Sequence, residues 1–102
     1  MTSQSYREPA SERAVLVIGA AGLDMIGTLR TPLQNAGSNP ASIRVSYGGV
    51  ARNIAENLAR LGQPVKLISA IGSDQLGKQL LDHTAACGVD VSACFISDQY
   101  AT

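Results

Sequence analysis

The chain has 102 residues, 45% of them hydrophobic, and eight basic residues balance eight acidic ones. This composition fits one domain with a packed core, and the neutral charge balance offers no basic patch for nucleic acid or an anionic membrane. No apolar stretch approaches the length that spans a bilayer. The two cysteines match no common zinc spacing and no secretion signal precedes them, so we expect reduced thiols and a cytoplasmic protein.

The first expected elements are one buried strand and a small flap. Residues 1–13 are polar and predict a loose lead-in before residues 14–102, which we assign to the folded domain. Residues 14–20 form a continuous apolar run that is typical of a parallel strand buried on both faces. Further along, residues 25–29 and 43–47 predict two flap strands joined by a polar loop.

A helix is expected over residues 50–61, where large apolar residues recur at helical spacing: Val50, Ile54, Leu58 and Leu61. This stripe is predicted to face the core, with Arg52 away from it on the solvated side. Gly62 follows as a helix-ending residue.

The remaining elements complete an alternating order. Residues 65–71 predict a second strand, Ser73 or Asp74 caps a helix that runs to about residue 86, and residues 91–96 predict a third strand. Helical crossovers between consecutive strands imply parallel pairing, so the fold class is α/β. Two helices cover a parallel sheet incompletely, and we therefore expect the 102 residues to be a truncated part of a longer protein.

Four residues around the first predicted helix have the chemistry of a ligand site. Gly48 and Gly49 allow a close backbone approach at the start of that helix. Asn53, one turn further on, can both donate and accept hydrogen bonds, as a grip on vicinal hydroxyls requires. Asp24 follows the first strand, where ligands of open parallel sheets gather, and its carboxylate can accept from two hydroxyls. A tight turn and solvated side chains would explain the same residues without a ligand.

The order of these features resembles the PfkB/ribokinase family of carbohydrate kinases. In that family a glycine pair, an asparagine four residues after the second glycine and a helix-ending glycine follow one another, as they do here over residues 48–62. Residues 72–77 are similar to the family's next Gly-x-Asp-x-x-Gly stretch, and the resemblance covers residues 14–96. It implies a ribokinase-like parallel sheet with crossover helices and a small β lid within residues 25–47.

The resemblance also implies a function. Such kinases transfer a phosphoryl group from ATP with Mg²⁺ to a sugar or nucleoside hydroxyl, and Asp24, Gly48, Gly49 and Asn53 match the family's substrate-binding positions. The catalytic aspartate belongs to a C-terminal Gly-Ala-Gly-Asp motif, which the 102 residues lack, as they lack a P-loop. No catalytic residue is therefore assigned in this chain, and by itself it is expected to be inactive and to bind neither ATP nor Mg²⁺.

A narrower resemblance concerns the acceptor. Ser38-Asn39-Pro40 in the flap, together with the stretch that follows Gly48, is similar to the pseudouridine kinases of this family. It implies that Asn39 contacts the base of a nucleoside. Ala51 departs from the glycine expected in that stretch, and an ordinary turn also explains a Ser-Asn-Pro sequence.

Two alternatives stay open at this stage. A dinucleotide-binding module would need Gly-x-Gly-x-x-Gly between first strand and first helix, and residues 19–22 lack that spacing. A non-catalytic assembly module is also compatible, because the open edges of the flap can pair with a second copy to give a homodimer. His83, Lys66 and Lys78 are expected to be solvated surface residues rather than catalytic groups.

Overall fold

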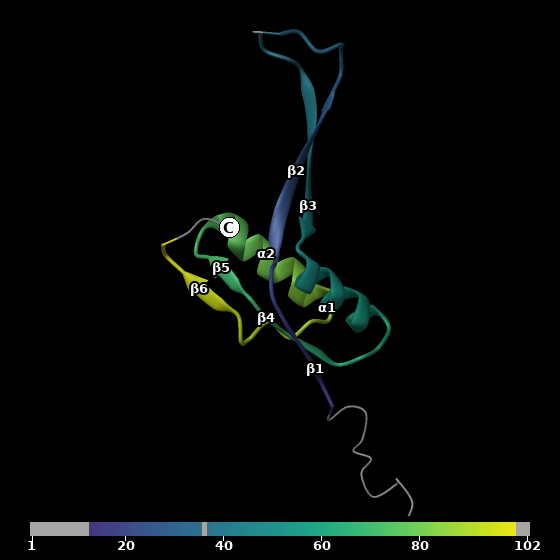
Figure 1. Cartoon of the computed structure of the whole chain (residues 1–102), viewed down its shortest axis with the longest axis vertical. Helices are drawn as coiled ribbons and strands as arrows, with labels where there is room; N and C mark the ends of the chain where they lie inside the picture. The colour runs from purple at the N-terminus through teal and green to yellow at the C-terminus, as the bar shows by residue number, and fades with distance from the viewer. Residues whose placement is uncertain (1–12, 36, 100–102) are drawn as a thin grey trace, which may run out of the picture.

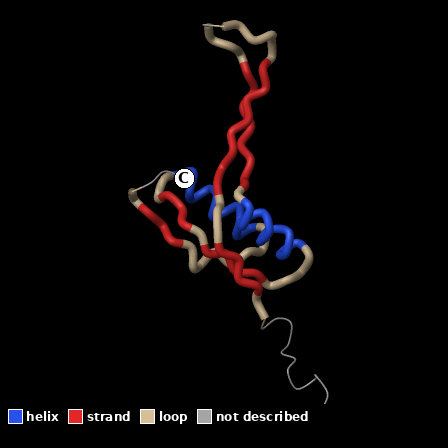
Figure 2. Tube along the Cα trace, viewed as in Figure 1, coloured by secondary structure: helices blue, strands red, loops and turns tan. Residues whose placement is uncertain are grey.

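A computed structural model of the chain describes residues 13–35 and 37–99, so the predicted lead-in falls almost entirely outside the described residues. The elements appear in the predicted order (Figures 1 and 2). They are β1 (Val15–Ile18), β2 (Gly22–Leu29), β3 (Ala41–Gly48), α1 (Val50–Arg60), β4 (Val65–Ile68), β5 (Ala70–Gly72), α2 (Gln75–Ala86) and β6 (Phe95–Ser97).

The predicted parallel pairing is confirmed. β1 pairs with β4 in parallel, from Val15 opposite Val65 to Ile18 opposite Ile68, and β5 pairs in parallel with β6. The expected second strand is interrupted at Ser69, whose carbonyl accepts the Phe95 amide at 2.8 Å. β4 and β5 are therefore consecutive parts of one central path between β1 and β6.

The third strand is shorter than predicted and begins later. Residues 91–94 form a turn in which the Cys94 amide donates to the Val91 carbonyl at 3.0 Å, so only Phe95–Ser97 pair as β6. Upstream of the turn, Asp90 already bonds to the central path through the Leu67 amide and the Val65 carbonyl. The apolar run at 91–96 therefore predicted the edge strand correctly but gave it the wrong boundaries.

The predicted flap is an antiparallel hairpin of β2 and β3. Its register runs from Gly22 opposite Gly48 to Leu29 opposite Ala41, so both strands are longer than expected. The hairpin projects away from the body, and its connecting loop lies at the far end (Figures 1 and 2). Glycine and aspartate are uncommon in strands, and their presence in β2 made the predicted strand too short. In the structure, the regular pairing with β3 extends through these residues.

The predicted buried stripe of the first helix is only partly correct, because Leu58 packs against the core whereas the other large apolar residues of the stripe are exposed. Val50 is 74% exposed and Leu61 is 83% exposed, whereas Ala51, Arg52 and Ala55 are buried. Small side chains let α1 approach the sheet closely, and a β-carbon on Gly19 would lie only 3.0 Å from the Ala51 methyl group. The surface of α1 that faces the sheet therefore consists largely of small side chains, and Val50, Ile54 and Leu61 lie outside it.

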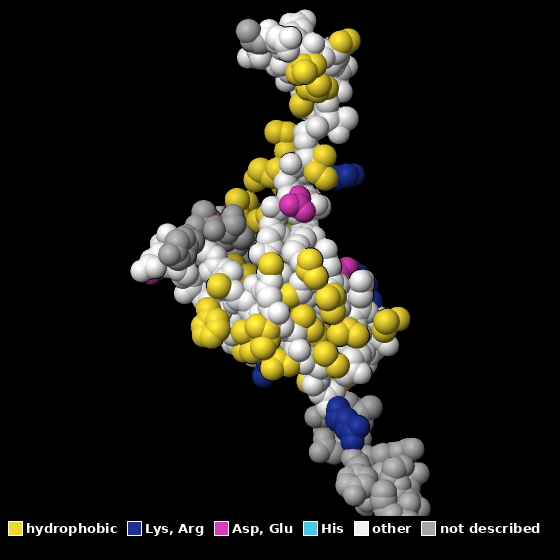
Figure 3. Space-filling view, in the orientation of Figure 1, with side chains coloured by type: hydrophobic (Ala, Val, Ile, Leu, Met, Phe, Trp, Pro, Cys, Tyr) yellow, Lys and Arg dark blue, Asp and Glu magenta, His cyan; other side chains and the backbone are white. Residues whose placement is uncertain are grey.

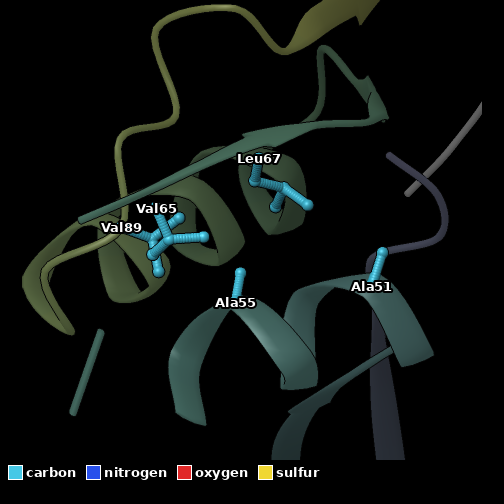
Figure 4. Packing of buried hydrophobic residues seen from close by; sticks show 5 residues of the cluster. All are labelled: Ala51, Ala55, Val65, Leu67 and Val89. Atoms are coloured by element: carbon cyan, nitrogen blue, oxygen red, sulfur yellow. The ribbon is translucent and has the colours of Figure 1, made fainter. Parts of the chain in front are cut away.

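The core is a small cluster between α1 and the strands. Ala51 and Ala55 of α1 pack against three larger residues, as Figure 4 shows: Val65, Leu67 and Val89. From Val65 onward every second residue of the central path is buried, which puts one face of the sheet under the helices. Leu80 of α2 is also fully buried.

Much apolar surface remains exposed on the body. Leu16 is 53% exposed, Ile18 is 70% exposed and Phe95 is 67% exposed. Figure 3 shows such side chains gathered over one face of the body and along the hairpin. Among the described residues, no helix is both long and apolar enough to cross a membrane.

Candidate functional site

The candidate site lies where the hairpin joins α1. Gly49 is the N-cap of this helix and has φ +93°. A β-carbon there would lie 2.5 Å from the Ala20 carbonyl oxygen, and that same oxygen accepts the Arg52 amide at 3.1 Å. The second glycine of the pair therefore lets the start of α1 dock against the segment between β1 and β2, a role that the sequence did not reveal.

Asp24 lies on the polar face of the hairpin and points along it toward α1. It is paired with Ser46, yet a β-carbon on Gly48 would lie 2.9 Å from its Oδ2 atom. The first glycine of the pair thus makes room for the Asp24 carboxylate. The side chain is exposed. Among the residues that the structure describes, none donates a hydrogen bond to the carboxylate or forms an ion pair with it. The carboxylate is available to accept from a ligand.

Asn53 lies in α1, four residues beyond Gly49, which corresponds to about 6 Å along the helix axis. Its side chain is exposed, and its Oδ1 atom accepts a hydrogen bond of 3.0 Å from Arg52 Nη1. Asp24 and Asn53 therefore border the same junction from its two sides, the end of the hairpin and the first turn of α1. That Asp24 and Asn53 contact one ligand stays a prediction.

Asn39 is placed differently. It lies in the loop at the far end of the hairpin, where its Oδ1 atom accepts the Gln34 amide at 2.7 Å. Its Nδ2 atom donates to the carbonyls of Gln34 and Gly37 at 3.1 and 3.2 Å. In this conformation the Asn39 amide organises its own loop and is not brought together with Asp24 and Asn53.

The Gly-x-Asp-x-x-Gly stretch forms the start of α2. Asp74 is the N-cap, and its Oδ1 atom accepts the Gly77 amide at 2.9 Å, which confirms one of the two predicted caps. A cavity of about 230 Å³ lies beside this turn, next to Lys78 and Ile96. Neither Asp24 nor Asn53 lines this cavity, so it is distinct from the candidate site.

A buried arginine network lies directly behind Asn53. Arg52 is only 2% exposed, although sequence reasoning put it on the solvated side of its helix. Its partner Glu56 also accepts from Arg60 at 2.8 Å, and hydrogen bonds from Arg60 and then Arg52 lower the pKa of Glu56 to about 2. The spacing of Arg52, Glu56 and Arg60 in steps of four was the available signal for this cluster.

The base of the hairpin is tied to α2 by an aromatic contact. Tyr47 stacks on His83 with ring centroids 4.1 Å apart and an interplanar angle of 16°. His83 is exposed, as expected for a solvated residue, but its ring face is used in packing. Lys66 pairs with Asp90 at 3.7 Å, and Lys78 pairs with Asp82 at 2.8 Å. Neither lysine lies at the junction site.

One group of side chains has the spacing of a metal site: Glu56, His83 and Cys87, whose ligand atoms lie within 4.8 Å of one another. Both Glu56 oxygens, however, accept from guanidinium groups, and Arg60 also donates to the Cys87 sulfur at 3.6 Å. A cation there would lie beside two positive charges and would have to displace them. The donor set therefore fits an ion-pair network better than a metal ion.

Comparison with known proteins identifies relatives of this chain. The profile of the pfkB family of carbohydrate kinases matches residues 12–102. Pseudouridine kinase of Escherichia coli (strain K12) is 48% identical over 82 residues, which are 80% of this chain and 26% of that enzyme. Guanosine-inosine kinase of Exiguobacterium acetylicum is 40% identical over 77 residues, 76% of this chain and 25% of that enzyme.

Solved structures agree with these matches. The fructokinase of Xylella fastidiosa with bound ATP superposes with a TM-score of 0.74 and 28% identity, covering 87% of this chain and 27% of that protein. The chain thus spans about a quarter of the length of the relatives that it matches. The ribokinase-like fold expected from the sequence is confirmed by such neighbours.

Proposed function

Because this chain belongs to the pfkB family of carbohydrate kinases, we propose that it forms the acceptor-binding part of an ATP-dependent sugar or nucleoside kinase. The observation that carries the proposal is the exposed Asp24 carboxylate, which lies against Gly48 at the start of α1 and has no partner among the described residues. An exposed carboxylate held at this junction is suited to accept hydrogen bonds from acceptor hydroxyls.

The geometry supports a proposed role for each of the four junction residues. Asp24 accepts from one acceptor hydroxyl, and Asn53 engages a neighbouring one from the first turn of α1. Gly48 and Gly49 act through shape, because the first leaves room for Asp24 and the second docks α1 against Ala20. Together they hold the acceptor in one orientation, and positioning of this kind is a large part of catalysis in phosphoryl transfer.

The phosphoryl-transfer machinery is not assigned to this chain. Its residues include neither a Gly-Ala-Gly-Asp motif nor a P-loop, so they do not provide the base or the phosphate cradle for ATP and Mg²⁺. ATP would supply the transferred phosphoryl group in the whole enzyme. We propose that residues 14–102 are the N-terminal part of its kinase domain and that the 102-residue chain alone transfers no phosphate.

The acceptor that we propose is pseudouridine. The Ser38-Asn39-Pro40 sequence and the similarity to a pseudouridine kinase support this choice. Asn39 can both donate to and accept from a uracil edge. Since its amide is bonded within its own loop, contact with a base requires closure of the hairpin and exchange of those bonds. We propose that the kinase works in the cytoplasm, where thiols such as those of Cys87 and Cys94 stay reduced.

The apolar face of the hairpin supports pairing with a second copy as an additional role. Met25, Ile43 and Val45 lie on one face of the ladder, and each is between 41% and 73% exposed. Burial of such a face against its copy would remove apolar area from water. We expect the wild-type protein to have the mass of a dimer in solution and Ile43→Ser to have the mass of a monomer. A wild-type monomer contradicts pairing through the hairpin.

The acceptor site is tested in the complete product of the reading frame with Asp24→Ala. Loss of a hydroxyl contact typically costs about 1–3 kcal/mol, which corresponds to a decrease in kcat/KM of roughly 5- to 150-fold. Asp82→Ala, which removes an exposed carboxylate from α2, is the matched control and should leave kcat/KM unchanged. An Asp24→Ala enzyme that folds and keeps wild-type kcat/KM contradicts the proposal.

A further inference from the structure

Arg52 is the most heavily bonded side chain near the site. It donates to Thr84 Oγ1 at 3.1 Å, to Asn53 Oδ1 at 3.0 Å and to Glu56 Oε1 at 2.5 Å. A longer contact of 3.5 Å reaches the Tyr47 carbonyl at the end of β3. One buried guanidinium therefore connects the hairpin base, α1 and α2.

The guanidinium is fixed by partners that have little freedom of their own. The Thr84 hydroxyl donates to the Leu80 carbonyl at 2.7 Å, which leaves its oxygen lone pairs for Arg52. Glu56 is charged at neutral pH because its pKa is about 2, so the ion pair with Arg52 persists there. A planar guanidinium held at two sides presents its remaining N–H groups in fixed directions.

We propose that Arg52 is a positioning residue that fixes the Asn53 side-chain amide with its NH₂ group toward the acceptor. An arginine offers only donors, so the end of the amide that faces it is the oxygen. The Nδ2 atom at the opposite end then faces away from Arg52, and it has no partner among the described residues. This inference rests on the proposed function, because it requires that Asn53 contact the acceptor.

The consequence is a defined pairing of hydrogen bonds. Asn53 becomes a donor toward the ligand, while Asp24 is an acceptor. The two positions then match a vicinal diol in which one hydroxyl donates its proton to Asp24 and the neighbouring oxygen accepts from Asn53. A free asparagine amide would tolerate either pattern, whereas one held by Arg52 rejects a group that can only donate.

The direct test is Asn53→Asp in the complete product of the reading frame. Aspartate keeps one oxygen on Arg52 but puts a second oxygen where the NH₂ group was. We expect KM for the acceptor to rise at least tenfold, as much as for Asn53→Ala, without loss of thermal stability. A KM within twofold of wild type, with Asn53→Ala impaired, overturns the inference. If neither variant alters KM, the placement of Asn53 in the acceptor site is wrong as well.

Arg52→Lys, with Arg60→Lys as the matched control, tests the arginine itself. Both arginines share Glu56, and only Arg52 contacts Asn53. We expect Arg52→Lys to raise KM threefold to tenfold in the wild-type background and less than twofold in the Asn53→Ala background, while Arg60→Lys leaves KM unchanged. Non-additivity of this kind isolates the Arg52–Asn53 contact. An equal increase in both backgrounds shows a general structural effect and overturns the inference.

Discussion

The paired helices and the hairpin differ in what holds them. Between α1 and α2, Arg52 is 2% exposed and bonded to Thr84 across the interface, and Glu56 joins Arg52 to Arg60. In the hairpin, Ile43 is 73% exposed, and the side-chain hydrogen bonds that the described residues make at its far end stay within the hairpin itself. The projecting hairpin is clear in Figure 2.

The difference supports the proposal that the paired helices form a well-packed platform and that the hairpin acts as a separate lid. Regions with few buried contacts open at low free-energy cost, and lids that close over ligands are drawn from such regions. Among the described residues, the hairpin is anchored near its base, through Tyr47 on His83 and through Arg52 on the Tyr47 carbonyl. Asp24 and Asn53 lie on either side of this anchored base, so the proposed acceptor site combines a fixed helix with the root of the lid.

The largest expected effect comes from a substitution at Gly49, where the hairpin meets α1. Gly49→Ala places a β-carbon 2.5 Å from the Ala20 carbonyl oxygen at φ +93°, so we expect the free energy of unfolding to fall by about 3 kcal/mol or more. Gly62→Ala is the matched control, because Gly62 also has positive φ but a β-carbon there meets nothing within 4 Å. It should cost only about 1 kcal/mol. Equal losses in urea unfolding would show that the close approach to Ala20 is unimportant.

A smaller effect concerns the charge network of the platform. The pKa of Glu56 is lowered from 4.5 to about 2, so its stabilisation is complete above pH 4.5 and is lost as pH falls toward 2. The upper limit is about 3 kcal/mol, and we expect about half of this because Glu56 is still 22% exposed. The measurement compares unfolding free energies at pH 5 and pH 2.5 in wild type and Glu56→Gln. A wild-type decrease no larger than that of the variant contradicts the network.

The smallest effect lies at the tip of the lid. Asn39→Ala removes three local hydrogen bonds in an exposed loop, so global stability should change by less than about 1 kcal/mol. Amide exchange in residues 30–40 should become faster, while exchange in α1 stays as in wild type. Faster exchange in α1 on this substitution would mean that lid and platform form one cooperative unit.

The sequence predicted the order of elements, the parallel pairing and the helix ends because these depend on local signals. Gly62 ends α1 with positive φ, and Asp74 caps α2. The four features that resemble the pfkB family lie on these same segments, and the family assignment is confirmed. Local chemistry was therefore sufficient for the fold class.

The buried face of α1 was not predictable from the large apolar residues. Periodicity assigned Val50 and Leu61 to the core, but Gly19 approaches Ala51 closely and the buried side chains are Ala51 and Ala55 instead. The choice depends on how closely the sheet approaches, which is a tertiary property. Burial of Arg52 has the same origin, since its partner Thr84 lies 32 residues away in the sequence. The roles of Asp24, Asn53 and Asn39 toward a ligand stay predictions.

The central claim is that these residues hold a nucleoside acceptor for phosphorylation. The most direct measurement ranks pseudouridine, adenosine, ribose and fructose by kcat/KM with ATP, using the complete product of the reading frame. We predict that pseudouridine leads, and that Asn39→Ala reduces this preference while kcat/KM for free sugars stays unchanged, because sugars have no base for the lid to contact. A higher kcat/KM for ribose or fructose than for pseudouridine would contradict the nucleoside assignment and leave only the family.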